Sequence, residues 1–199
     1  MDTSPASPVS AGSTDSAAAR KLMHTRTMSC NGYLRSDGLF DIEGELRDIT
    51  PVDTDLLFKR VPAGEPIHHM RIVMTLDTKM VIQDVKAHIE AGPTVYCVDI
   101  ESAYAGLKGM QIGAGFRKQI KAVVGGVSGC THLTELLGLL ANTAMQTRFA
   151  VGRVERNGRL PADESGTMAP PAVINSCYTN RADGEAMKVL WPLHRRPAT

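Results

Sequence analysis

Apolar and charged residues alternate along residues 40–47 (FDIEGELR). Every even position there is apolar or glycine and every odd position is charged, which is the period of a β-strand buried on one face. The preceding Ser36-Asp37-Gly38 is typical of a tight turn. We therefore expect residues 28–35 to form the antiparallel partner strand of a hairpin.

The same period of two returns further along the chain. Residues 70–77 carry apolar side chains at their even positions, and residues 77–80 follow as a hairpin loop. Residues 81–89 are the next predicted strand, with Val81, Val85, Ala87 and Ile89 on one face and charged residues on the other. Together the strands predict an antiparallel meander with one solvent-facing side.

Beyond the strands, the apolar period lengthens to that of a helix. The first predicted helix starts at Asp99 as N-cap and ends before Gly109, and the second covers residues 116–124 before Gly125-Gly126. The third has the widest apolar stripe, with Thr131 as its expected N-cap. Strands followed by helices predict an α+β fold, with three helices packed on one face of an antiparallel sheet.

Two polar segments flank or interrupt this pattern. Residues 2–20 consist mostly of Ser, Thr, Pro, Ala and Gly, with Val9 as the single large apolar residue, so we expect residues 1–20 to be a disordered tail. Residues 155–171 are predicted to be a loop before a C-terminal segment. The expected organisation is thus one α+β domain over residues 21–199.

Composition narrows the classes of function. The 22 basic and 21 acidic residues leave a formal net charge of +1, which argues against nucleic acid as a dedicated partner. We also expect no membrane partner and a cytoplasmic location, because the sequence has neither a stretch of 18 apolar residues nor the pattern of a secretory signal. A small-molecule partner and the oligomeric state stay open.

Cys130 is the first candidate for chemistry. It lies in the glycine-rich segment 125–132 (GGVSGCTH), where the third helix begins, and His132 follows it. The positive end of a helix dipole favours the thiolate, which attacks electrophiles or binds metals. The alternative is a small buried cysteine that packs under the helix.

His68 and Cys97 are the other candidates. His68 shares the inward face of Met70, whereas the adjacent His69 points to the opposite side of the strand. The alternative for His68 is a hydrogen bond to a backbone carbonyl. Cys97 lies near the predicted start of the first helix.

The remaining cysteines and the acidic residues suggest less chemistry. The four cysteines form no C-x-x-C pair, so a structural zinc finger is not expected. Cys30 is predicted to be a core residue, and Cys177 follows the long loop. An acidic run is expected to lie on the solvated face of the sheet; its members are Asp37, Asp41, Glu43, Glu45 and Asp48.

Two resemblances extend this interpretation. Residues 31–46 (NGYLRSDGLFDIEGEL) and 129–137 (GCTHLTELL) resemble a bacterial domain-of-unknown-function family, number 2889, over residues 24–192, and this resemblance implies no established activity. Residues 61–146 are more weakly similar to the U-type iron–sulfur scaffold proteins, which implies a scaffold-like topology.

The scaffold resemblance can be followed residue by residue. His68 falls on that family's Asp position, and Pro66 replaces its first cysteine. Cys97 lies four residues after the second cysteine position, and Gly129-Cys130 takes the place of a His-Cys pair. The resemblance therefore implies a different metal, or a site remade for catalysis, in preference to an iron–sulfur cluster.

These observations favour one site where three loops converge. We expect His68, Cys97 and Cys130 to bind a zinc or iron ion, with His132 as a fourth ligand or as the catalytic partner of Cys130. An open position on the ion could serve a small-molecule enzyme. One alternative is a metal-free enzyme with Cys130 as nucleophile and His68 or His132 as its base. The other is a non-enzymatic accessory or scaffold module that binds partners through a methionine-rich face.

Overall fold

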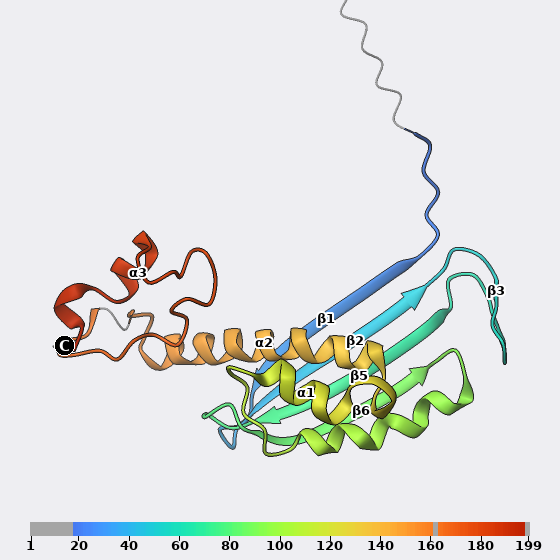
Figure 1. Ribbon diagram of the computed structural model, residues 1–199, viewed down its shortest axis with the longest axis horizontal. Helices are drawn as coiled ribbons and strands as arrows, with labels where there is room; N and C mark the ends of the chain where they lie inside the picture. The colour runs from blue at the N-terminus through green and yellow to red at the C-terminus, as the bar shows by residue number, and fades with distance from the viewer. Residues whose placement is uncertain (1–17, 161–162, 198–199) are drawn as a thin grey trace, which may run out of the picture.

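The computed structural model describes residues 18–160 and 163–197. Most of the predicted N-terminal tail, residues 1–17, lies outside the described residues. The chain forms an antiparallel sheet with helices on one side, which confirms the predicted α+β class (Figure 1).

Four long strands make up this sheet in the order β1-β2-β5-β6, with every neighbouring pair antiparallel. Their bounds are Thr25–Leu34 for β1, Phe40–Ile49 for β2, Pro66–Leu76 for β5 and Ile82–Ala91 for β6. The connection from β2 to β5 carries a small two-stranded ribbon, β3 (Thr54–Asp55) with β4 (Arg60–Val61). On β6 the buried face holds Ile82 in place of the predicted Val81, because the register of β5 and β6 shifts beside this residue.

The helices follow the sheet in the chain. The 3₁₀ helix η1 (Val95–Leu107) precedes α1 (Phe116–Val124), the short η2 (Gly126–Ser128) and the long α2 (Thr131–Glu155). The C-terminal segment holds α3 (Glu185–Leu190) and η4 (Leu193–Arg195), and it lies beyond the sheet at the far end of α2 (Figure 1). In the described part of the chain, no helix is long and apolar enough to cross a membrane.

Two predicted helix starts are wrong. η1 begins at Val95, and its N-cap is Thr94, whose side chain accepts a hydrogen bond from the Tyr96 backbone N–H; Asp99 lies inside the helix. The N-cap of α2 is Cys130, without a side-chain capping bond, and Thr131 is the first helical residue. Tyr104 and Leu107, the buried residues of η1, are three positions apart, a spacing that suits the three-residue turn of a 3₁₀ helix.

The core lies between the sheet and the helices. Even-numbered residues of β2 and β5 are buried together with the apolar stripe of α2, which contributes Leu133, Leu136, Leu137 and Leu140. Gly44 interrupts the apolar row of β2, and a Cβ there would lie 3.0 Å from Leu140 Cδ2. A Cβ on Gly32 of β1 would overlap the Thr147 hydroxyl. These two glycines therefore set how closely α2 approaches the sheet.

Candidate functional site

A polar row crosses three strands at the end of the sheet where α2 begins. Arg26 of β1 pairs with Asp48 of β2, and Asp48 pairs with His68 of β5. All three are even-numbered, like the buried Leu46 of β2, so the period of the strands turns them towards the helices. The row thus closes one end of the apolar core with side chains that carry chemistry.

Asp48 is the centre of this row. Its side chain is 1% exposed and accepts hydrogen bonds from Arg26, at 2.8 Å from Nε to Oδ1 and 2.7 Å from Nη2 to Oδ2. His24 Nε2 lies 3.2 Å from Oδ1. Burial would raise the pKa of Asp48, but the hydrogen bonds and charge of Arg26, helped by His24, hold it at about 2. Asp48 is therefore ionised at neutral pH.

His68 is oriented by this carboxylate. Its Nδ1 lies 3.0 Å from Asp48 Oδ2, and an ionised carboxylate only accepts, so Nδ1 carries the proton of this hydrogen bond. Burial lowers the pKa of His68, and the neighbouring His132 lowers it further, against the pull of Asp48. The ring is accordingly neutral at pH 7, with a lone pair on Nε2.

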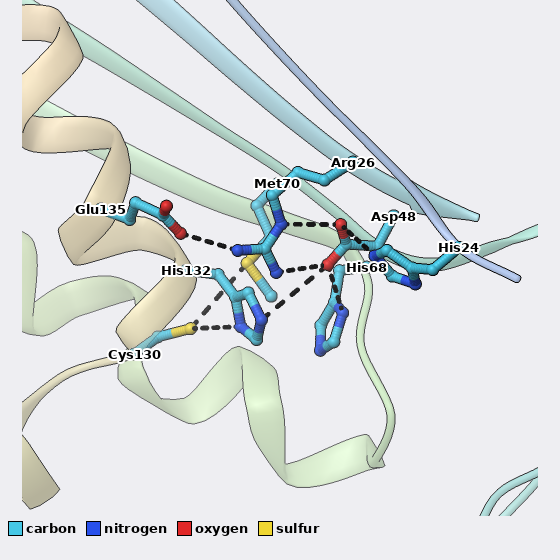
Figure 2. A network of polar contacts seen from close by, with 8 residues as sticks. All are labelled: His24, Arg26, Asp48, His68, Met70, Cys130, His132 and Glu135. Carbon is cyan, nitrogen blue, oxygen red and sulfur yellow. Dashed lines mark hydrogen bonds and ion pairs between the residues drawn. The ribbon is translucent and has the colours of Figure 1, made fainter. Parts of the chain in front are cut away.

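His132 reaches the row from the first turn of α2. Its ring centroid lies 3.9 Å from that of His68 with 33° between the ring planes, and its Nε2 is 3.9 Å from Asp48 Oδ2. Burial, followed by the charge of Arg26, lowers the pKa of His132 in spite of Asp48 and Glu135. Figure 2 shows both rings on the same side of the Asp48 carboxylate. The site therefore holds two neutral imidazoles beside one carboxylate.

Cys130 borders this group at the start of α2. Its Sγ lies 3.9 Å from His132 Nδ1 and 3.9 Å from Met70 Sδ (Figure 2). The buried Tyr104 fixes the backbone there, because its hydroxyl accepts a hydrogen bond from the Cys130 N–H at 3.0 Å and lies 3.1 Å from Thr134 Oγ1. The thiol is thus held beside the His132 ring.

The structure brings together some of the predicted residues. Within the described residues, the group of His, Cys, Asp or Glu side chains able to share an ion is Asp48, His68 and His132, whose ligand atoms all lie within 4.8 Å of one another. Cys130 lies beside this group without belonging to it. Cys97 is not part of the group; its Sγ lies 3.4 Å from Thr94 Oγ1, and its side chain packs over Gly92.

The other two cysteines lie outside this group as well. Cys30 is partly buried against the core, and burial raises the pKa of its thiol. Cys177 is exposed in the C-terminal segment.

Asp48 is the residue that sequence reasoning missed, since its placement on the solvated face is wrong. The strand residues Asp41, Glu43 and Glu45 are odd-numbered, and only Asp48 has the parity of the buried face of β2. Its even position in the strand was therefore the sequence signal that could have placed Asp48 on the buried face. Arg26 likewise has the parity of the partly buried Met28 on β1.

Comparison with known proteins adds a family. The family model described as "Protein of unknown function (DUF2889)" matches residues 24–146, a range that includes Arg26, Asp48, His68, Cys130 and His132. The match ends inside α2, before the expected limit at residue 192. No match was found among curated proteins or among solved structures. The similarity of residues 61–146 to U-type scaffold proteins stays a prediction.

Proposed function

The chain belongs to the DUF2889 family, whose description names no activity, and we propose from the site that the protein binds one zinc or iron ion at Asp48, His68 and His132. The observation that carries this proposal is the mutual distance of their ligand atoms, all within 4.8 Å. Two imidazoles and one carboxylate form the ligand set of non-haem iron sites and of many catalytic zinc sites.

The distances suit a shared ion. Ligand atoms about 2.1 Å from one ion are separated by about 3–3.5 Å. Asp48 Oδ2 lies 3.0 Å from His68 Nδ1 and 3.9 Å from His132 Nε2, and a small rotation of the His132 ring would shorten the second distance. The ion would replace the proton that His68 shares with Asp48.

The charges around the site also favour a cation. Arg26 Nη1 contacts Glu135 Oε2 at 2.7 Å, so the single guanidinium faces two carboxylates, Asp48 and Glu135. Two carboxylates thus share one guanidinium at this site. Arg26 also fixes the orientation of the Asp48 carboxylate, as residues behind metal ligands commonly do.

Three protein ligands leave coordination positions free. A metal ion bound there would activate water or polarise a carbonyl oxygen of a small molecule. Cys130 lies on the His132 side of the group, 3.9 Å from the ring, and is placed to contact such a molecule. This arrangement is the basis for proposing a small-molecule enzyme.

Metal analysis of the purified protein tests the proposal. We expect about one zinc or iron ion per chain, removed by a chelator and restored by Zn²⁺ or Fe²⁺. His68→Gln and His132→Gln should each lose the ion while their far-ultraviolet circular dichroism is unchanged. His194→Gln, which alters an exposed histidine of η4, is the matched control and should retain it. Failure of the stripped wild type to bind either ion at micromolar concentration would overturn the proposal.

A second candidate function is a metal-free cysteine enzyme. It is favoured by the row of Cys130 Sγ, the His132 ring and Asp48 Oδ2, with 3.9 Å at each step. In that role His132 Nδ1 would accept the thiol proton while Asp48 orients the ring.

Alkylation of the chelator-stripped protein separates the two candidates. If Cys130 is an activated nucleophile, it should react with iodoacetamide faster than the exposed Cys177, and His132→Gln should slow it about tenfold or more. Faster reaction at Cys177 would exclude this candidate and leave the metal proposal unaffected.

A further inference from the structure

A cavity of about 350 Å³ lies where the C-terminal end of α2 meets the C-terminal segment. These two parts of the chain adjoin beyond the edge of the sheet (Figure 1). The helix α2 rises about 1.5 Å per residue, so this end is about 30 Å from His132. The cavity is therefore separate from the metal site proposed above, and its volume lies in the range of small-molecule sites.

Three arginines line the cavity: Arg153, Arg156 and Arg159. Within residues 18–160 and 163–197, no Asp or Glu oxygen lies within 4.0 Å of any of these guanidinium groups, whereas the nearby Arg148 has Glu155 at 3.7 Å. Arg156 Nε donates at 3.4 Å to the carbonyl of Arg159, which holds two of the three arginines in one turn. The Asp163 carboxylate also lies at this end of the chain, where it accepts a hydrogen bond from the Leu160 N–H at 3.1 Å. Guanidinium groups that make no ion pair favour an anion, and they bind carboxylate and phosphate through two parallel hydrogen bonds.

The rest of the lining is mainly apolar. Phe149, Leu160, Met168, Val173 and Leu190 face the same space. An inorganic ion would contact the arginines and leave these side chains in water. A ligand with an anionic head and an apolar chain would satisfy both parts of the lining.

We propose that this cavity binds a soluble single-chain amphiphile with a carboxylate or phosphate head, with the head on Arg153 and Arg156 and the chain against the apolar wall. Because the arginines bind the head and the apolar wall binds the chain, we expect that neither part of the ligand binds well alone. No covalent step is involved.

The chain contains its own reporter for such binding. Trp191 is its single tryptophan, and the indole Nε1 donates at 2.8 Å to the carbonyl of Met168, which lines the cavity. Leu190, another lining residue, is adjacent in sequence. A ligand against this wall is expected to change the Trp191 fluorescence.

The test is a titration of the full chain, followed by Trp191 fluorescence and calorimetry. The probes are decyl phosphate and decanoate, kept below their micellar concentrations. Both should give saturable binding, and the double variant Arg153→Gln/Arg156→Gln should raise Kd at least about tenfold because two charged hydrogen-bonding groups are lost. Arg47→Gln, which alters an exposed arginine of β2, is the matched control and should leave Kd unchanged.

Three further probes define the outcomes that would overturn the proposal. Decyltrimethylammonium binding as tightly as decyl phosphate, or an unchanged Kd in the double variant, would show apolar adsorption without recognition of charge. Inorganic phosphate binding as tightly would remove the role of the apolar wall. Binding to vesicles of anionic phospholipid without binding to monomeric decyl phosphate would replace the soluble ligand with a lipid surface. Val173→Phe, which narrows the cavity and leaves the arginines in place, should also weaken decyl phosphate binding.

Discussion

Asp48 depends on Arg26 more than on any other neighbour. Arg26 contacts both carboxylate oxygens, whereas His24 and His68 each contact one. A buried carboxylate that loses its cation keeps the cost of desolvation without the attraction that offsets it. Although Arg26 is partly exposed, its loss is therefore expected to destabilise the polar row.

Arg26→Met should lower the free energy of unfolding by about 1–3 kcal/mol, below the usual cost of breaking a fully buried pair because the arginine side chain is 33% exposed. Urea denaturation measures this loss. Arg47→Met is the control, since Arg47 is exposed and has no ion pair among the described residues, and it should change stability by less than about 0.5 kcal/mol. Equal losses of stability in the two variants would show that the buried Asp48 carboxylate does not depend on the Arg26 guanidinium.

For single residues, what the sequence can predict is which face of a strand each side chain occupies, because odd and even positions point to opposite sides. His68 was expected to point inward because it continues the even-numbered row of Met70, and its side chain is only 15% exposed. The same parity places Asp48 on the buried face, whereas its position at the end of an acidic run favours solvent, so the two signals conflict at this residue. The contact with His132 joins residues 64 positions apart, which no local pattern indicates.

The packing of α2 on the sheet is the main contact between elements. Its apolar stripe was predicted from the helical period, and Leu133, Leu136, Leu137 and Leu140 are all fully buried. The close approach at Gly32 and Gly44 was not predicted, because a glycine in a strand does not reveal which element lies above it. The start of α2 also differed, since Cys130 occupies the N-cap without a side-chain bond.

Two glycine substitutions, one at this contact and one on α2 away from it, have opposite expected effects on stability. Gly32→Ala should lower stability by about 1–3 kcal/mol, because its Cβ would overlap Thr147 and move α2. Gly138→Ala should raise stability by about 0.5–1 kcal/mol, because this helical position has no atom within 4 Å of a Cβ. Urea denaturation gives both values.

A rescue variant distinguishes overlap from a general effect on β1. Adding Thr147→Ala to Gly32→Ala removes the overlapping hydroxyl and should restore part of the lost stability. If the stability changes of the two single variants simply add up in the double variant, overlap with Thr147 is not the cause of the stability lost in Gly32→Ala.

The whole molecule has two parts that meet along α2. The antiparallel order brings the start of β5 and the end of β2 to the same end of the sheet, which places Asp48 beside His68. The apolar core extends along the chain from Met28 to Val151, and the buried Met187 of α3 is not part of it. The C-terminal segment lacks a regular apolar period, which is why neither α3 nor its cavity could be predicted.

A chain that ends at Gly158 tests whether these two parts are independent. It keeps every residue of the core and the complete Asp48–His68–His132 group, and it loses the segment that forms one wall of the cavity. We expect cooperative thermal unfolding, followed by far-ultraviolet circular dichroism, with a Tm within about 5 °C of the full chain. Zinc binding should persist and the calorimetric signal for decyl phosphate should disappear. Loss of cooperative unfolding would show instead that the C-terminal segment stabilises the sheet and helices, and that the two proposed sites belong to one folding unit.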